Sequence, residues 1–346
     1  MRFSTYIVGL CLLLCASVTY ASQGVLNVYI WGGEVPDSVI QQFEKETGIK
    51  VNYSTYDNNE TLYAKLKATK RSGYDIIEPS SYYVDRMRRE GMLQVIDRQK
   101  LSNYKNLDPS LLNQAYDPTG EYDIPLVWGT TGLFINTKFF SNTTLDQWNQ
   151  LWNPMYKNKV LLLDDPREVF SMALISLGYS ASDSDPQHIK EAYLKLKKLM
   201  PNVRLFSSDA VPSLVADDDA TVGMIWNGDL HNAREDNPNL KFVYPTEGFG
   251  IWVDCFAIPK DAPHLDNAYR FLNFMMRGDV AVQSTLQNNY AVANLAARQL
   301  LPKALANDPV IFPSAETLKH GEFQMDVSDE ALALYNYYWT LLKIEA

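Results

Sequence analysis

The chain has 346 residues, of which 46% are hydrophobic and 12% aromatic, so it is long enough for two domains and too apolar for a disordered protein. It carries 31 basic and 41 acidic residues, a formal net charge of −10, which gives no support to nucleic acid as a partner because phosphate contacts depend on clustered lysine and arginine. Its 3 cysteines are too few for a disulfide scaffold.

The N-terminus has the pattern of a secretory signal peptide. A positive start precedes an apolar run at 6–18 and a small residue, Ala21, after which we expect cleavage. The run is shorter than the roughly 20 residues of a bilayer span. A lipoprotein is the less favoured alternative, because Leu14 stands where a small residue would be needed before Cys15. Residues 1–21 are therefore predicted to be removed.

Cleavage would leave 30 basic and 41 acidic residues, a net charge of −11, and one thiol, Cys255. A single thiol cannot form an internal disulfide, so we expect Cys255 to be a small buried side chain. An exported, soluble protein without disulfides is typical of the bacterial periplasm.

The mature chain opens with strand, helix and strand. Residues 25–31 are rich in β-forming side chains, Pro36 and Asp37 signal a helix start, Gly48 ends that helix, and 49–53 form a second strand. This order predicts a βαβ unit of a parallel sheet.

The strand and helix pattern continues to the C-terminus. Further strands are predicted at 74–77, 160–163, 221–226 and 250–258, and helices from Pro79 to Gly91, from Asp165 to Gly178, and near 189–200, 268–276 and 330–342. The chain is therefore an α/β protein, without a repeat of fixed period or a low-complexity linker.

One long apolar strand, 124–135, is predicted to cross between two domains, with its glycines absorbing rotation at a hinge. Residues 251–258 could form the return crossing. Two lobes joined by crossing strands therefore fit the chain better than two domains on a linker.

Enzyme and metal motifs are largely missing. The sequence has no GxSxG, GxxxxGK[ST] or HExxH motif, and its four histidines are isolated from one another. The acidic run 217–219 is best interpreted as a solvated loop, with a cation site as the less favoured alternative. We expect no catalytic activity, no cofactor and no metal.

Aromatic and carboxylate side chains recur where strands end or begin, the edge at which open α/β sheets bind ligands. These residues are Trp31, Tyr82, Tyr83, Asp165, Glu168, Trp226, Trp252 and Asp254. An aromatic face attracts a cation by about 0.5–2 kcal/mol. A carboxylate adds a charge-assisted hydrogen bond of about 1.5–3 kcal/mol. The pattern favours a pocket for an amine cation.

Each of these residues also has a structural alternative. Asp165 and Glu168 fit a helix capping box around Pro166, and capping is the favoured interpretation of the residues alone. Each tryptophan alone is more often a core residue than a ligand contact. Tyr82 and Tyr83 could lie on an ordinary helix face or, less favoured, form a paired-tyrosine iron site.

Six stretches in one order resemble the spermidine/putrescine-binding proteins of polyamine ABC transporters, closest to the spermidine-preferring branch: 43–51, 53–56, 59–67, 79–85, 223–228 and 294–298. The resemblance implies a two-lobed periplasmic-binding-protein fold of type II, with the ligand cleft between lobes joined by crossing strands. The expected N-terminal lobe is 22–130 plus 254–300, and the expected C-terminal lobe is 131–253 plus 301–346, both discontinuous.

The resemblance also implies the contacts of a ligand site. The aromatic box would be Trp31, Tyr82, Trp226, Trp252 and Tyr290; the amine-binding carboxylates Asp165, Glu168 and Asp254; and the polar contacts Ser80, Ser208 and Gln324. After the first tryptophan the family usually has a hydroxyl residue, an acid and a tyrosine, whereas this chain has Gly32, Gly33 and Glu34. Glu34 is therefore a further candidate for ligand binding.

The resemblance implies a periplasmic protein that captures spermidine first and putrescine second by lobe closure, and delivers them to the membrane permease of an ABC transporter. We expect a monomer with no nucleic-acid partner. Two alternatives remain: a polyamine-sensing protein for a membrane signalling receptor, and an enzyme acting on an amine with Cys255 or Glu168 as catalyst.

Overall fold

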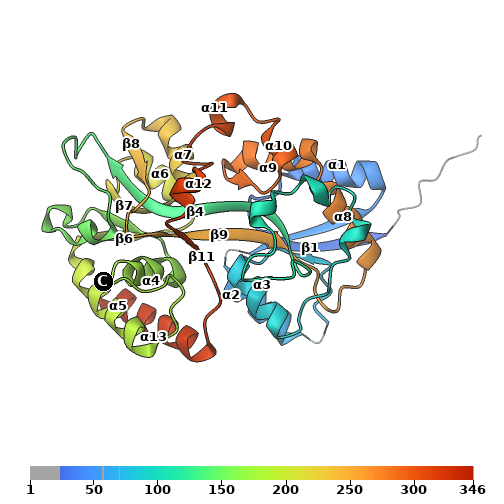
Figure 1. Ribbon diagram of the computed structural model, residues 1–346, viewed down its shortest axis with the longest axis horizontal. Helices are drawn as coiled ribbons and strands as arrows, with labels where there is room; N and C mark the ends of the chain where they lie inside the picture. The colour runs from blue at the N-terminus through green and yellow to red at the C-terminus, as the bar shows by residue number, and fades with distance from the viewer. Residues whose placement is uncertain (1–23, 57, 70, 346) are drawn as a thin grey trace, which may run out of the picture.

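The computed structural model describes residues 24–56, 58–69 and 71–345, so the predicted signal peptide lies outside the described residues. The chain forms two lobes. One holds β1 (Val25–Trp31) and α1 (Asp37–Thr47), and the other holds β6 (Val203–Phe206), β7 (Val222–Trp226) and α5 (Pro186–Leu199) (Figure 1). Within the described residues, no helix combines the length and the apolar composition that a bilayer crossing requires. The prediction of a two-lobed α/β fold is confirmed.

The N-terminal lobe begins with the predicted βαβ unit. Strand β1 (Val25–Trp31) is followed by α1 (Asp37–Thr47) and pairs in parallel with β2 (Lys50–Tyr56). Strand β3 (Ile76–Ile77) lies on the other side of β1, which gives the order β2-β1-β3. Helix α1 ends at Gly48, whose φ of 71° is the left-handed conformation that favours glycine.

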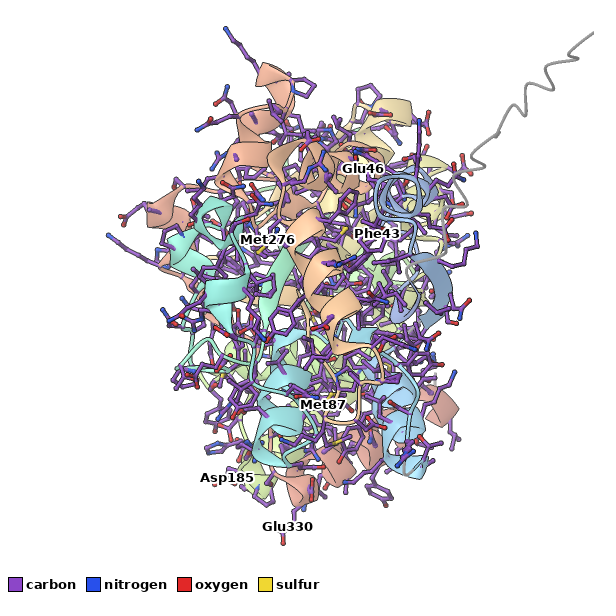
Figure 2. The ribbon with its side chains drawn as sticks, turned by 90° about the vertical axis from the view of Figure 1, so that its right-hand side faces the viewer. Phe43, Glu46, Met87, Asp185, Met276 and Glu330 are labelled. Carbon is purple, nitrogen blue, oxygen red and sulfur yellow. The ribbon has the colours of Figure 1, made fainter. Side chains whose placement is uncertain are left out.

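Further helices complete this lobe. They are α2 (Asn59–Ala68), α3 (Ser81–Arg89), α8 (Leu265–Met275), α9 (Gly278–Asn288) and α10 (Leu295–Arg298). Phe43 of α1 packs edge-on against Phe271 and Phe274 of α8, each 5.2 Å away between ring centroids. Phe43 and Met276, which follows α8, belong to the same buried cluster, and both are labelled in Figure 2. An early and a late segment of the chain thus share one core.

The C-terminal lobe is built on a larger sheet with the order β11-β9-β4-β7-β5-β6. Its strands include β5 (Val160–Leu162), β6 (Val203–Phe206), β7 (Val222–Trp226), β8 (Leu240–Val243), β10 (Ala291–Val292) and β11 (Gly321–Phe323). The helices that follow these strands or complete the chain are α4 (Pro166–Ile175), α5 (Pro186–Leu199), α6 (Val211–Ala216), α7 (Asn227–Asp236), α11 (Lys303–Ala306), α12 (Ala315–Leu318) and α13 (Asp329–Glu345).

Two long antiparallel strands, β4 (Ile124–Asn136) and β9 (Phe249–Phe256), join the lobes, as Figure 1 shows. The first half of β4 pairs with β9 and β10, and its second half with β7 and β8. The predicted crossing strands are therefore present. A side chain at Gly129 would collide with the indole of Trp252, so this glycine is also needed for close packing.

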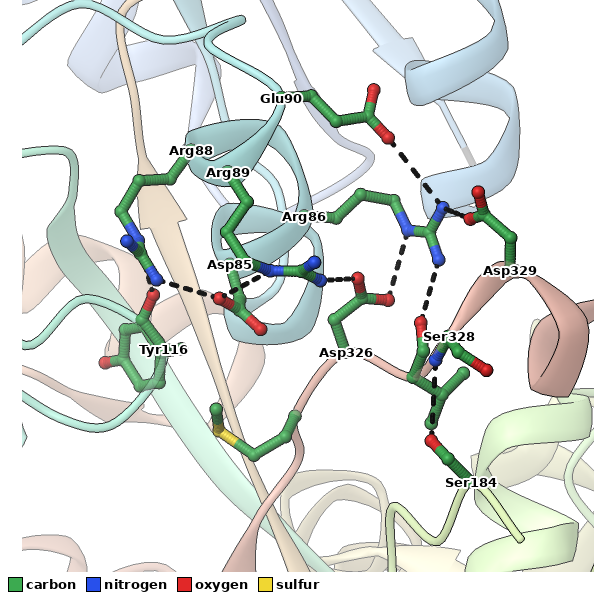
Figure 3. Close-up of polar contacts among 12 residues, drawn as sticks. Asp85, Arg86, Arg88, Arg89, Glu90, Tyr116, Ser184, Asp326, Ser328 and Asp329 are labelled. Atoms are coloured by element: carbon green, nitrogen blue, oxygen red, sulfur yellow. Dashed lines mark hydrogen bonds and ion pairs between the residues drawn. The ribbon is translucent and has the colours of Figure 1, made fainter.

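A third connection runs from β11 to α13 and is held by arginines of α3 (Figure 3). Arg86 donates from Nε to Asp326 Oδ1 at 3.1 Å and from Nη2 to the carbonyl of Val327 at 3.0 Å. Arg89 bonds the second carboxylate oxygen of Asp326. The side chains of Arg86 and Asp326 are both buried, so this ion pair ties the connection to the N-terminal lobe.

Replacing Arg86 by methionine is expected to lower the free energy of unfolding by about 1–2 kcal/mol, because buried Asp326 would keep only one of its two arginines. The matched control is Arg89→Met, whose half-exposed side chain should contribute under about 0.5 kcal/mol. Urea unfolding followed by circular dichroism measures both. If both variants lose the same free energy of unfolding, the buried Arg86–Asp326 pair does not stabilise the protein more than the Arg89–Asp326 pair, and the interpretation is wrong.

Candidate functional site

A cavity of about 480 Å³ lies between the lobes, and every residue predicted for the ligand site lines it. These residues are Trp31, Ser80, Tyr82, Asp165, Glu168, Ser208, Trp226, Trp252, Asp254, Tyr290 and Gln324, together with the further candidate Glu34. The structure therefore brings the predicted residues together. That they bind a ligand stays a prediction.

Strand ends explain how these distant residues meet. Trp31 ends β1, Trp226 ends β7, and Asp165 follows β5 at the start of α4. Trp252 and Asp254 lie on the crossing strand β9. The backbone of Asp254 forms an isolated antiparallel β-bridge with Ser80, in the segment between β3 and α3. The cavity thus lies at the edge where the strands of both lobes end, as expected for open α/β sheets.

Asp165 and Glu168 form the acidic side of the C-terminal lobe. Asp165 Oδ1 accepts hydrogen bonds from the backbone N–H groups of Arg167 at 2.7 Å and Glu168 at 3.1 Å, so the predicted capping of α4 is confirmed. Glu168 Oε1 accepts from Trp226 Nε1 at 3.3 Å and from Gln324 Nε2 at 2.9 Å. Asp165 therefore caps the helix while also facing the cavity.

Glu168 is unusually easy to protonate. Its burial, and then the charge of Asp165, raise its pKa to about 7, although the donors Trp226 and Gln324 oppose the shift. Burial likewise raises the pKa of Asp165, against the two backbone N–H groups that it caps. Burial has removed the water that would solvate these two carboxylates, so a bound cation would stabilise their ionised form.

Asp254 forms the acidic side of the N-terminal lobe. The hydroxyl of Ser80 donates to Asp254 Oδ1, and Asn59 Nδ2 donates to Ser80 Oγ and to the hydroxyl oxygen of Tyr82, each at 3.0 Å. Burial raises the pKa of Asp254 to about 6, while the Ser80 hydroxyl works in the opposite direction. This chain of hydrogen bonds holds the carboxylate toward the cavity.

Aromatic rings line the space between the two acidic sides. Trp252 and Tyr290 meet edge-on with centroids 5.1 Å apart, and Trp31 packs against Tyr56 at 4.8 Å. The guanidinium of Arg167 stacks on the ring of Tyr82, 4.9 Å from its centroid. Among the described residues no lysine, arginine or histidine lines the cavity, so its ionisable side chains are all carboxyl or phenol groups.

Besides Gly32 and Gly33, which flank Glu34, sequence reasoning missed five lining residues, Tyr56, Asn59, Asp209, Asp229 and Asn288. Asp229 is the most informative of them, because it accepts a hydrogen bond from the hydroxyl of Tyr290 at 2.8 Å and burial raises its pKa to about 6. It stands in the first turn of α7, three residues after Trp226. A search for acids in the first helical turn after each strand, as well as at the strand end itself, would have found it.

Two residues considered for chemistry lie outside the cavity. Cys255 is fully buried, as predicted, and does not line it. Asp218, in the acidic run 217–219, pairs with Lys138 at 2.6 Å and with Asn136 at 2.7 Å. The acidic run therefore has a structural partner, in agreement with the loop interpretation.

A family model described as bacterial extracellular solute-binding protein matches residues 38–313. A spermidine/putrescine-binding periplasmic protein of Salmonella typhimurium is 46% identical over 333 residues, which cover 96% of this chain and 95% of the relative. A putrescine-binding periplasmic protein of Pseudomonas aeruginosa is 34% identical, covering 96% of this chain and 97% of the relative.

Solved structures agree with these relatives. The spermidine/putrescine ABC transporter substrate-binding protein of Streptococcus pneumoniae superposes with a TM-score of 0.81 at 35% identity, covering 93% of this chain and 99% of that one. A lipoprotein of Treponema pallidum superposes with the same TM-score at 28% identity, covering 92% of this chain and 99% of that one.

Proposed function

The chain belongs to the bacterial extracellular solute-binding proteins, in the group of the spermidine/putrescine-binding periplasmic proteins, and we propose that its cavity captures a polyamine, spermidine first and putrescine second. The observation that carries this proposal is the charge of the cavity. Six carboxyl groups line it, and no basic residue of the described chain does. Buried carboxylates without a counter-charge cost several kcal/mol each, which a polycation would offset.

The two acidic sides explain why a long cation fits better than a small one. Asp165 and Glu168 belong to the C-terminal lobe, whereas Asp254 comes with the hydrogen-bonded group at Ser80 on the other lobe. A polyamine that reaches both sides would join the lobes, with its methylene groups between the rings of Trp252, Trp31 and their neighbours. Closure on the ligand follows from this geometry.

Specificity would come from unpaired charge. Closure excludes water, so an uncharged analogue of the same length would leave the carboxylates without hydrogen-bond donors. Micromolar affinity requires about 8 kcal/mol of net binding free energy. A few charge-assisted hydrogen bonds and cation–π contacts supply this after the cost of association.

The relatives are periplasmic binding proteins and not enzymes by name, which supports a transport role in the same compartment. The proposal includes export through the predicted signal peptide, delivery to the permease of an ABC transporter, and a monomer that needs no cofactor, metal or nucleic acid. The lobe boundaries given above remain part of this proposal. The signalling alternative gains no support from these relatives.

Calorimetry with spermidine, putrescine, spermine and an uncharged diol of similar length tests the proposal. We expect saturable heat with spermidine at micromolar concentration, weaker binding of putrescine, and none of the diol, because the diol cannot pair with the carboxylates. Absence of binding by every amine would contradict the proposed function. Conversion of spermidine into a product would instead favour the enzyme alternative.

A further inference from the structure

Glu34 brings a third carboxyl group to the N-terminal side of the cavity. It follows Trp31 in the loop before α1, and it lies close enough to Glu78 and Asp254 for the charges of both to raise its pKa. Glu78 stands between β3 and α3, and Asp254 is on β9. Three segments that are far apart in the sequence therefore place three acids together.

Within the described part of the chain, several polar atoms around these acids have no N–H, hydroxyl or carbonyl partner. Among the described residues, no N–H group or hydroxyl donates to the buried oxygens Glu34 Oε2 and Glu78 Oε1, although Glu78 is 0% exposed. The indole Nε1 of Trp252, which lines the same cavity, is also buried without an acceptor. Glu34 can hydrogen-bond the carboxyl groups of Glu78 and Asp254 only while a proton is shared between them, so the ionised acids need a donor from a ligand.

Among the residues that the structure describes, no basic side chain contributes to the electrostatic surroundings of Glu34. Tyr53 and Tyr56 face it from β2, Tyr290 from the segment before β10, and Glu78 and Asp254 from the other sides. All of these groups are acids or phenols. Burial is the largest cause that raises the pKa of Glu34 and of Glu78, and repulsion between the carboxylates adds to it. Three such groups cannot all be ionised in the empty protein.

We propose that Glu34 and Asp254, with the buried Glu78 behind them, form one subsite for a primary ammonium group, and that this group replaces a proton that the three acids share when the cavity is empty. This inference rests on the proposed function. On binding, a carboxylic O–H bond breaks and its proton leaves to bulk solvent. The ammonium group keeps its own three protons and donates hydrogen bonds to the carboxylates of Glu34 and Asp254, which line the cavity.

The exchange makes affinity depend on pH in a fixed direction. The carboxyl pKa values are raised in the empty cavity and lowered again by the ammonium charge. Acidification therefore increases the fraction of empty protein that is protonated, and this proton competes with the ammonium group. Affinity is full above the raised pKa and falls as pH drops through it, by about tenfold per pH unit for each proton exchanged. Glu168, whose pKa is about 7, exchanges a proton by the same reasoning, so a variant is needed to assign the share of Glu34.

Calorimetry of spermidine binding at pH 7 in phosphate and in Tris buffer counts the released protons, because the two buffers differ in ionisation enthalpy. We expect the wild type to release about one proton or more, and Glu34→Gln to release about one fewer. The matched control is Asp266→Asn, which changes an exposed acid of α8 outside the cavity and should release as many protons as the wild type. A release by Glu34→Gln that equals the wild-type release would overturn the inference.

The outcomes separate this inference from the proposed function. If no amine binds at any pH, the proposed function fails. If spermidine binds to the wild type without proton release, only the exchange at this subsite fails. Should Glu34→Gln not fold, Glu34→Tyr serves as the second variant, because a phenol stays neutral at pH 7. If Glu34→Tyr releases about one proton fewer than the wild type, the inference is supported. If it releases as many protons as the wild type, the inference is contradicted.

Discussion

Replacing Glu168 by glutamine is expected to weaken spermidine binding about 100-fold at pH 8. The substitution removes a fully buried charge and puts an amide N–H₂ group against Gln324 Nε2, which now donates to Glu168 Oε1 at 2.9 Å. Loss of one charge-assisted hydrogen bond accounts for about 1.5–3 kcal/mol, or roughly 10–150-fold. Titration calorimetry measures the ratio of dissociation constants.

The effect of Glu168→Gln should shrink on acidification. The pKa of Glu168 is raised to about 7, so the carboxylate of the empty wild type is largely protonated at pH 6 and spermidine must displace that proton. We therefore expect the loss to fall to about tenfold at pH 6. The matched control, Asp164→Asn, removes an exposed acid of the same segment that pairs with Lys343 outside the cavity, and should change affinity less than twofold, by about 0.4 kcal/mol at most. A loss independent of pH would contradict the role of Glu168 as an ionised ligand group.

Replacing Asp254 by asparagine is expected to weaken spermidine binding about 30-fold, and by at least about tenfold. The amide keeps the shape of the side chain and can still accept from the Ser80 hydroxyl, but it removes the negative charge that faces the cavity. Calorimetry at pH 7.5 measures the change. Near-wild-type affinity would remove Asp254 from the proposed site.

Stability distinguishes this loss from a folding defect. Asparagine relieves the repulsion that Asp254 shares with Glu34 and Glu78, so the unfolding temperature of Asp254→Asn should be equal to that of the wild type or higher. Asp266→Asn, on the exposed face of α8, is the matched control and should leave both quantities unchanged. A lower unfolding temperature together with lost binding would indicate a structural role for Asp254.

Much of the fold could be predicted because local signals agree with the tertiary structure. Pro36 and Gly48 bracket α1, and the apolar run of β4 is buried along its whole length. Boundaries were less predictable. The strand expected at 74–77 is only Ile76–Ile77, because the Asp75 side chain accepts from the backbone N–H groups of Asn27 and His264 and leaves the regular ladder.

The site could be predicted where one residue carries a recognisable pattern, such as Trp226 at a strand end or Asp165 at a helix start. It could not be predicted where the signal is a meeting of distant segments. Glu78 is fully buried behind the cavity, and nothing near it in the sequence indicates that it lies against Glu34 and Asp254. The strand-end pattern therefore identified the acidic sides of the cavity but not the carboxyl cluster in one of them.

A crystal structure with spermidine bound tests the central claim most directly. The account predicts one terminal nitrogen within about 3 Å of Asp254 or Glu34 and another amine nitrogen within about 3 Å of Glu168 or Asp165, with the methylene chain between the tryptophan and tyrosine rings. Spermidine bound outside the cavity, or in it with every nitrogen more than about 5 Å from these carboxylates, would contradict it.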